Sequence, residues 1–95
     1  MIEKQGKRLQ LCGAMTMQNV NALLAEVVPL LTEPEMEMDL AQVTEVDSSA
    51  VSLMFEWLRR AHHKKIRLEF VNMPHTLLNL AALYGVDGFI THRPH

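Results

Sequence analysis

Three small polar residues, Asp47, Ser48 and Ser49, stand between two apolar-patterned segments of this 95-residue chain. Oxygens of Asp and Ser side chains accept hydrogen bonds from the free N–H groups of a first helical turn, so a helix is expected to begin here. Such a helix start carries about half a positive charge, which favours a phosphate attached to or docked at Ser48. The alternative is that Ser48 or Ser49 only caps the helix, a contribution of about 0.5–2 kcal/mol.

The residues that follow have the spacing of an amphipathic helix that runs to about His63 or Lys64. The face predicted to pack on the core contains Val51, Met54, Phe55, Leu58, Ala61 and His62. The opposite face contains Ser52, Glu56, Arg59 and His63.

A narrow strip beside the predicted core face recurs at positions i, i+4, i+8 and i+11 of this helix. It consists of Ser49, Leu53, Trp57 and Arg60. If the core holds the face from 51 to 58, Leu53 and Trp57 lie at its border, and a Trp and Arg cluster is typical of protein interfaces. The alternative is that both residues flank the core and pack under a neighbouring loop. In the first interpretation a protein partner binds the strip, and a charge added at Ser48 alters the same surface.

Catalytic and metal sites have little support in the sequence. The four glycines lie apart, and neither serine has the Gly-x-Ser-x-Gly setting of a nucleophile elbow. A hydrolase that uses Ser48 is therefore a remote alternative. His62 and His63 diverge by about 100° on a helix, and Cys12 has no metal-ligand spacing to a histidine. We expect no enzymatic activity, no metal and no cofactor.

Composition predicts one small domain, residues 1–95, with a largely aliphatic core. Hydrophobic residues make up 48% of the chain and aromatic residues only 5%. Nine basic and eleven acidic side chains give a formal charge of -2, which argues against a nucleic-acid partner. The single cysteine, Cys12, lies in an apolar alternation and is predicted to be buried. Without a signal peptide or an apolar run of about 20 residues, the chain is expected to be cytoplasmic.

Strand and helix patterns alternate along the chain. Strands are predicted over residues 2–5, 7–12, 36–46 and 66–71, with a turn at Gly6 and an end of the second strand at Gly13. Helices are predicted over 17–31, capped by Thr16 and shortened by Pro29, over 48–63, and from Pro74 to Tyr84, closed by Gly85. Residues 86–90 are expected to hold a short turn and an edge strand, and 92–95 to fray.

This order predicts an α/β fold with parallel pairing through helical crossovers. The expected architecture is a mixed four- to five-stranded sheet covered by three to four helices.

The sequence Asp47-Ser48-Ser49-Ala50-Val51 resembles the signature of STAS domains, the fold of anti-sigma-factor antagonists and of sulfate-transporter C-terminal domains. The resemblance extends over essentially the whole chain. Residues 55–59, 70–74 and 80–86 are most similar to the small cytoplasmic STAS subunit of Mla-type phospholipid ABC transporters. The resemblance implies binding to the transporter's ATPase subunit at the inner-membrane face, through Ser48, Ser49, Leu53, Trp57 and Arg60.

For the anti-sigma-factor antagonists, the resemblance implies instead that a partner kinase phosphorylates the serine after the aspartate, Ser48. This chain departs from many members of the family at one position, because Ala50 stands where they have Gly. Alanine favours a helix by about 1 kcal/mol over glycine, so the first turn is expected to be stiffer and less open to a kinase. Docking is therefore the first hypothesis and the phosphorylation switch the second.

Overall fold

The computed structural model describes residues 2–85 and 92–93. In chain order its elements are β1 (Ile2–Gln5), β2 (Arg8–Met15), α1 (Val20–Val27), the 3-10 helix η1 (Val28–Leu30), β3 (Glu35–Val46), α2 (Ser48–His63), β4 (Arg67–Val71), α3 (His75–Leu83) and β5 (His92–Arg93).

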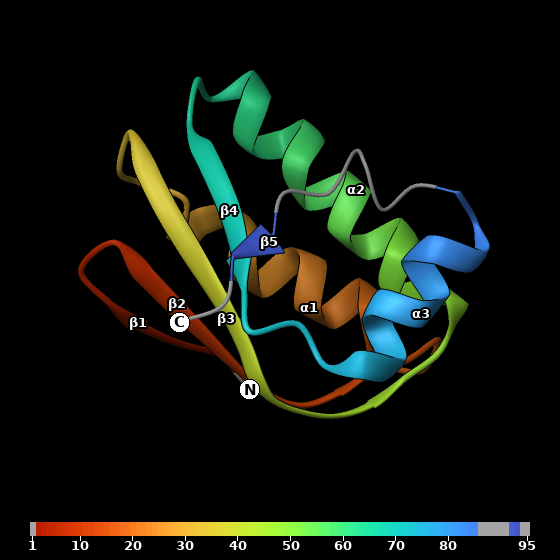
Figure 1. Cartoon of the computed structure of the whole chain (residues 1–95). Helices are drawn as coiled ribbons and strands as arrows, with labels where there is room; N and C mark the ends of the chain where they lie inside the picture. Colours follow the sequence, from red (N-terminus) through yellow and green to blue (C-terminus); the bar gives the residue numbers. More distant parts are fainter. Residues whose placement is uncertain (1, 86–91, 94–95) are drawn as a thin grey trace.

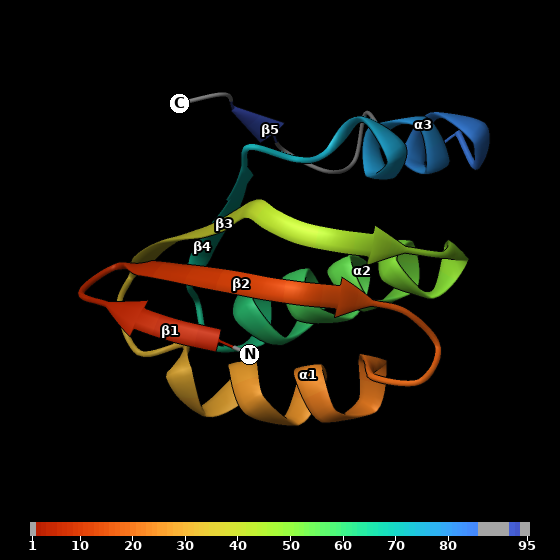
Figure 2. The ribbon, with the colours of Figure 1, turned by 90° about the horizontal axis from the view of Figure 1, so that it is seen from below.

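The strands of the described residues form a five-stranded mixed sheet in the order β1-β2-β3-β4-β5 (Figure 1). β1 is antiparallel to β2, with Ile2 opposite Leu11, and the pairs from β2 to β5 are parallel. The crossover helices α1 and α2 lie side by side on one face of the sheet, and α3 lies next to α2 (Figure 2). The predicted α/β architecture is confirmed.

Alternation along the strands places large apolar side chains on the face that α1 and α2 cover. The side chains that point toward the helices are buried, and they include Leu9, Leu11, Met36, Met38, Leu68 and Phe70. Their neighbours Arg8, Glu37 and Glu69 are only half-buried on the other face. Cys12 is half-buried on β2 as well, so the prediction of a buried cysteine is wrong. It stands next to the inward-pointing Leu11 and therefore on the opposite side of the sheet.

β3 is longer than its pairing with β4. The two strands are paired as far as Asp39 opposite Val71, and residues 40–46 pair with β2 alone among the described strands. The β2–β3 register shifts twice, between Gln10 and Cys12 and between Gly13 and Ala14. Both shifts place an extra residue in β3. Gly13 therefore does not end β2 as predicted, because its φ of 100° lets the strand pass through this irregularity to Met15.

Both ends of helix α1 differ from a simple continuous helix. The Oδ1 of Asn19 accepts hydrogen bonds from the Thr16 backbone N–H at 3.0 Å and from its hydroxyl at 2.7 Å. This turn delays the helix to Val20, so the prediction of a start at residue 17 is wrong. Pro29 lies within η1, which replaces the last α-helical turn as predicted.

The C-terminal part confirms one predicted boundary and corrects two others. Gly85 follows α3 with a φ of 69°, as expected for a glycine that closes a helix. Pro74 has an extended ψ of 152° and caps α3 instead of forming its first turn. Residues 92–93 form β5 beside β4 and are not frayed. The turn and strand predicted over 86–90 lie outside the described residues, as do residues 94–95.

Within residues 2–85 and 92–93, no helix combines the length and the apolar character needed to cross a bilayer. Over the same two ranges, no group of three or more His, Cys, Asp or Glu side chains is placed to hold a metal ion.

Candidate functional site

The Asp47 carboxylate organises the start of α2. Asp47 has extended backbone angles, and its Oδ1 accepts a hydrogen bond from the Ser49 N–H at 2.9 Å. Its Oδ2 accepts a second one from the Met17 N–H at 3.0 Å. The bond from Met17, followed by those from Ser49, holds the pKa of Asp47 below its ordinary value of 3.8, although burial opposes this shift. One carboxylate therefore caps α2 and fixes the loop between β2 and α1.

The two serines differ in accessibility. Ser48 is the first residue of α2 and is exposed, and its hydroxyl has no hydrogen-bond partner among residues 2–85 and 92–93. Ser49 is half-buried. The predicted helix start is confirmed, with Asp47 as the cap and Ser48 presented to solvent at the end of the helix that favours negative charge.

Leu53 and Trp57 do not lie on an open surface. The exposed fraction is 4% for Leu53 and 0% for Trp57, whose ring packs against that of Phe70 with centroids 6.5 Å apart. The indole Nε1 has no hydrogen-bond partner among the described residues. The interpretation that both side chains border the core and are open to a partner is wrong, and they belong to the core itself.

The buried face of α2 is rotated about the helix axis relative to the predicted face. Its buried residues are Ala50, Val51, Leu53, Met54, Trp57 and Ala61. Phe55 and Leu58 are only half-buried, and His62 is exposed. A face centred on the tryptophan, the largest apolar side chain of the helix, would have placed Ala50 and Ala61 inward correctly. The small alanines allow the helix to approach the sheet closely around that ring.

Two residues of the predicted strip, Ser49 and Leu53, line a groove between α1 and α2. This groove has a volume of about 300 Å³ and is lined by Val20, Asn21, Leu24, Ser49, Ser52, Leu53 and Glu56. One turn further along α2, the Nε of Arg60 donates to Glu56 Oε2 at 2.9 Å. Arg59 also donates to Glu56, and the hydrogen bonds from Arg59 and then Arg60 lower the pKa of that carboxyl. The structure thus brings Ser49, Glu56 and Arg60 to one side of α2.

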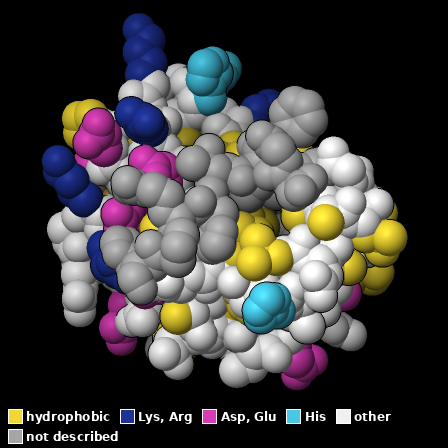
Figure 3. All heavy atoms as spheres, in the orientation of Figure 1, with side chains coloured by type: hydrophobic (Ala, Val, Ile, Leu, Met, Phe, Trp, Pro, Cys, Tyr) yellow, Lys and Arg dark blue, Asp and Glu magenta, His cyan; other side chains and the backbone are white. Residues whose placement is uncertain are grey.

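Exposed apolar side chains near the start of α2 were missed in the sequence. Met17 is 73% exposed and follows the loop that Asp47 holds, and Leu83 and Tyr84 are 78% and 55% exposed at the end of α3. A hollow of about 340 Å³ lies between β3 and α3, lined by Val46, Thr76, Asn79, Leu80 and Leu83. Figure 3 shows hydrophobic side chains gathered on the α3 side of the molecule, with Lys and Arg side chains at the opposite end. In the sequence these exposed residues are single apolar side chains next to the ends of helices. They are too few to form a periodic pattern that would have indicated a surface.

A family model described as "Mlab, STAS domain" matches residues 1–91. The chain belongs to the STAS domain family. The resemblance to STAS domains noted around Asp47, Ser48 and Ser49 is therefore confirmed for the family as a whole.

Solved structures show the same STAS fold at low sequence identity. The anti-sigma factor antagonist SpoIIAA in its unphosphorylated form is 15% identical, with a TM-score of 0.75 over 98% of this chain and 86% of that one. An anti-sigma factor antagonist from Mycobacterium paratuberculosis is 16% identical, with a TM-score of 0.77 over 100% and 84%. SLC26A9 is 16% identical, with a TM-score of 0.77 over 92% of this chain but 18% of that one. Among curated protein sequences, none matches this chain.

Proposed function

We propose that this chain is a non-catalytic accessory subunit that binds the cytoplasmic ATPase subunit of an Mla-type phospholipid-transporting ABC complex. The observation that carries the proposal is the exposed Ser48 end of α2, with apolar side chains beside it and no machinery for catalysis recognised in the sequence. The description of the matching family model supports the choice of transporter. Residues 1–95 then act as one STAS domain, held at the inner-membrane face through the complex.

The proposed docking surface differs from the strip predicted in the sequence. We define it as Met17, Ser48, Ser49 and Arg60 together with the groove between α1 and α2. Leu53 forms part of the groove floor, and Trp57 supports it from the core. Exposed Met17 supplies the apolar contact that the buried indole cannot make.

A bulky substitution at the centre of this surface tests the proposal. We expect Ser48→Trp to abolish co-purification of the ATPase subunit, because the indole fills space that a partner must approach. Thr32→Trp is the matched control, since Thr32 is exposed between η1 and β3, away from α2's start. Circular dichroism verifies that both variants fold. Equal recovery of the ATPase subunit with the two variants would show that Ser48 is not in the interface.

A second candidate function is a phosphorylation-controlled partner switch, in which the chain acts as an anti-sigma-factor antagonist. The exposed Ser48 hydroxyl at a helix start favours it, as does the shared fold with SpoIIAA, solved in unphosphorylated and phosphorylated forms. A phosphate there carries about -1.5 to -2 charge and would repel an acidic partner surface. The stiff first turn at Ala50 is the feature that weighs against it.

Intact-mass measurement separates the two functions. The chain and the variant Ser48→Ala are incubated with ATP and the anti-sigma kinase encoded nearest to it. Addition of one phosphate to the native chain alone supports the switch. No mass change in either sample, with a known substrate phosphorylated in parallel, argues for the docking function. Neighbouring genes for a permease, an ATPase and a periplasmic lipid carrier would argue the same way.

A further inference from the structure

The Asp39 carboxylate lies at the point where the sheet narrows. β4 ends at Val71 opposite Asp39, and the chain continues through Asn72 to α3. Asp39 is 5% exposed and is the one buried charged side chain among residues 2–85. A charge this inaccessible persists only when its oxygens are hydrogen-bonded.

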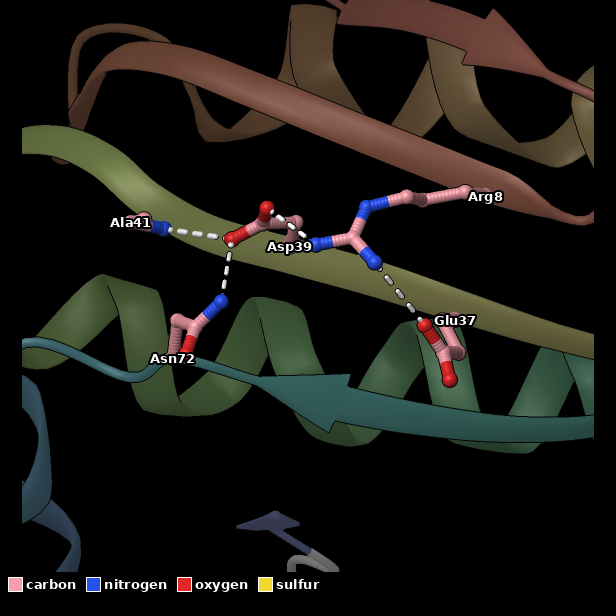
Figure 4. A network of polar contacts seen from close by, with 5 residues as sticks. All are labelled: Arg8, Glu37, Asp39, Ala41 and Asn72. Carbon is pink, nitrogen blue, oxygen red and sulfur yellow. Dashed lines mark hydrogen bonds and ion pairs between the residues drawn. The ribbon is translucent and has the colours of Figure 1, made fainter. Parts of the chain in front are cut away.

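Both oxygens of Asp39 are engaged, and they are bound by different parts of the fold (Figure 4). Oδ2 accepts from Arg8 on β2 at 2.5 Å, and that guanidinium also donates to Glu37 at 3.3 Å. Oδ1 accepts from the Ala41 N–H at 2.9 Å, at the first register shift of β3, and from Asn72 Nδ2 at 3.2 Å. One side chain therefore joins β2, the irregular part of β3 and the connection to α3.

The connection to α3 needs such a support. Asn72 has a φ of 57°, a left-handed conformation that asparagine tolerates better than most residues. Helix α3 has no side-chain cap, and its buried residues are Leu77 and Ala81. Between α3 and the end of β3 lies the hollow of about 340 Å³ described above, so the two elements are not tightly packed there. Among the described residues, its placement therefore depends on the contact with α2 and on the attachment at its N-terminus.

We infer that Asp39 is a positioning residue, which holds α3 beside the start of α2 through its Oδ1 bond to Asn72. The inference rests on the proposed function where it concerns docking, because Leu83 of α3 lines the same hollow as Val46, two residues before Ser48 of the docking surface. Its structural part stands without a partner. The Arg8 half of the network stabilises the sheet, and the Asn72 half sets the position of α3.

Two variants separate these halves. Asn72→Gly removes the amide but keeps the left-handed backbone accessible. We expect hydrogen exchange in α3 to rise about tenfold or more, because a hydrogen bond to a charged group is lost, while exchange in β2 and α2 stays near the native rate. Asp39→Asn retains a carbonyl oxygen for Ala41 and Asn72 but loses the negative charge that pairs with Arg8. It should keep native-like exchange in α3 and lower the urea midpoint of the whole domain.

Exchange in α3 that is unchanged by Asn72→Gly would overturn the inference, and so would an increase spread evenly over all elements. Circular dichroism of both variants verifies that they fold. With the ATPase subunit added, Asn72→Gly should weaken binding by the factor by which the population with α3 in place falls, which reaches about threefold once α3 is displaced for about two thirds of the time. Loosened α3 with unchanged binding would support the positioning role and show that the partner does not depend on α3.

Discussion

At the scale of single residues, Trp57 shows how burial separates a structural role from a binding role. Its ring is enclosed and packs on Phe70, yet its N–H has no hydrogen-bond partner among the described residues. An unpaired buried donor is unfavourable, so the ring is retained for its volume. Substitution of Trp57 should therefore act first on stability.

We expect Trp57→Ala to lower the free energy of unfolding by about 3–5 kcal/mol, because it leaves a cavity at the centre of the core. Trp57→Phe should cost only about 1–2 kcal/mol, since it keeps an aromatic ring and removes the unpaired N–H. Urea denaturation followed by far-ultraviolet circular dichroism gives both values. Phe55→Ala is the control. A larger loss of unfolding free energy for Phe55→Ala than for Trp57→Ala would support the core face that was predicted from the sequence.

The candidate site could be predicted from the sequence in part. The chemistry of Asp and Ser at a helix start is local, so the cap and the first residue of α2 followed from three neighbouring residues. The orientation of α2 depends on which face the sheet accepts, and that is a tertiary property. The buried face of α2 includes Ala50 and Ala61, and it is turned about the helix axis relative to the predicted face. Leu53 and Trp57 are therefore enclosed. The Asp39 network joins residues 8, 39 and 72, far apart in the chain, and no spacing rule signals it.

At the scale of elements, the alternation of strands and helices was sufficient to predict the α/β fold and its parallel pairing. Element ends were harder because they depend on side-chain competition and on register. Asn19 closes a turn that delays α1, and a glycine expected to end β2 instead carries it through a register shift. Neither event changes the periodic pattern of apolar residues on which the prediction was based.

Gly13 provides a test of this view of β2. A Cβ at Gly13 would meet no atom within 4 Å, but its φ of 100° is strained for any other residue. We expect Gly13→Ala to lower the free energy of unfolding by about 1–2 kcal/mol through the backbone alone. Gly6→Asn is the matched control, because asparagine tolerates the φ of 61° at that turn. The midpoint temperature of thermal unfolding should be clearly lower for Gly13→Ala than for Gly6→Asn. Equal midpoints would mean that β2 accommodates alanine at position 13 without backbone strain.

At the scale of the whole molecule, three carboxyl groups link stability to acidity. For Asp39, burial alone would raise the pKa, but the hydrogen bonds from Arg8, Ala41 and Asn72 outweigh it and hold the pKa below 3.8. The pKa values of Asp47 and Glu56 are lowered too. A carboxyl with a lowered folded-state pKa stabilises the fold fully above its unfolded pKa and loses that contribution as pH falls through the folded value.

The urea midpoint should therefore change little between about pH 7 and pH 5 and fall steeply below about pH 4. Asp39→Asn should reduce this fall, because its side chain no longer titrates. Denaturation curves at constant ionic strength measure both effects. A midpoint that rises on acidification would show that these carboxyls gain no stabilisation from their partners.

The part of β3 beyond Asp39, which pairs with β2 alone among the described strands, has a consequence for the behaviour of the chain at high concentration. An extended strand with one free edge can template the addition of a strand from another copy, and repeated addition leads to fibres. The two extra residues in β3 twist this edge, and exposed Glu45 adds a charge to it. The irregular backbone beside Asp39 is therefore expected to disfavour the addition of a strand from another copy along residues 40–46.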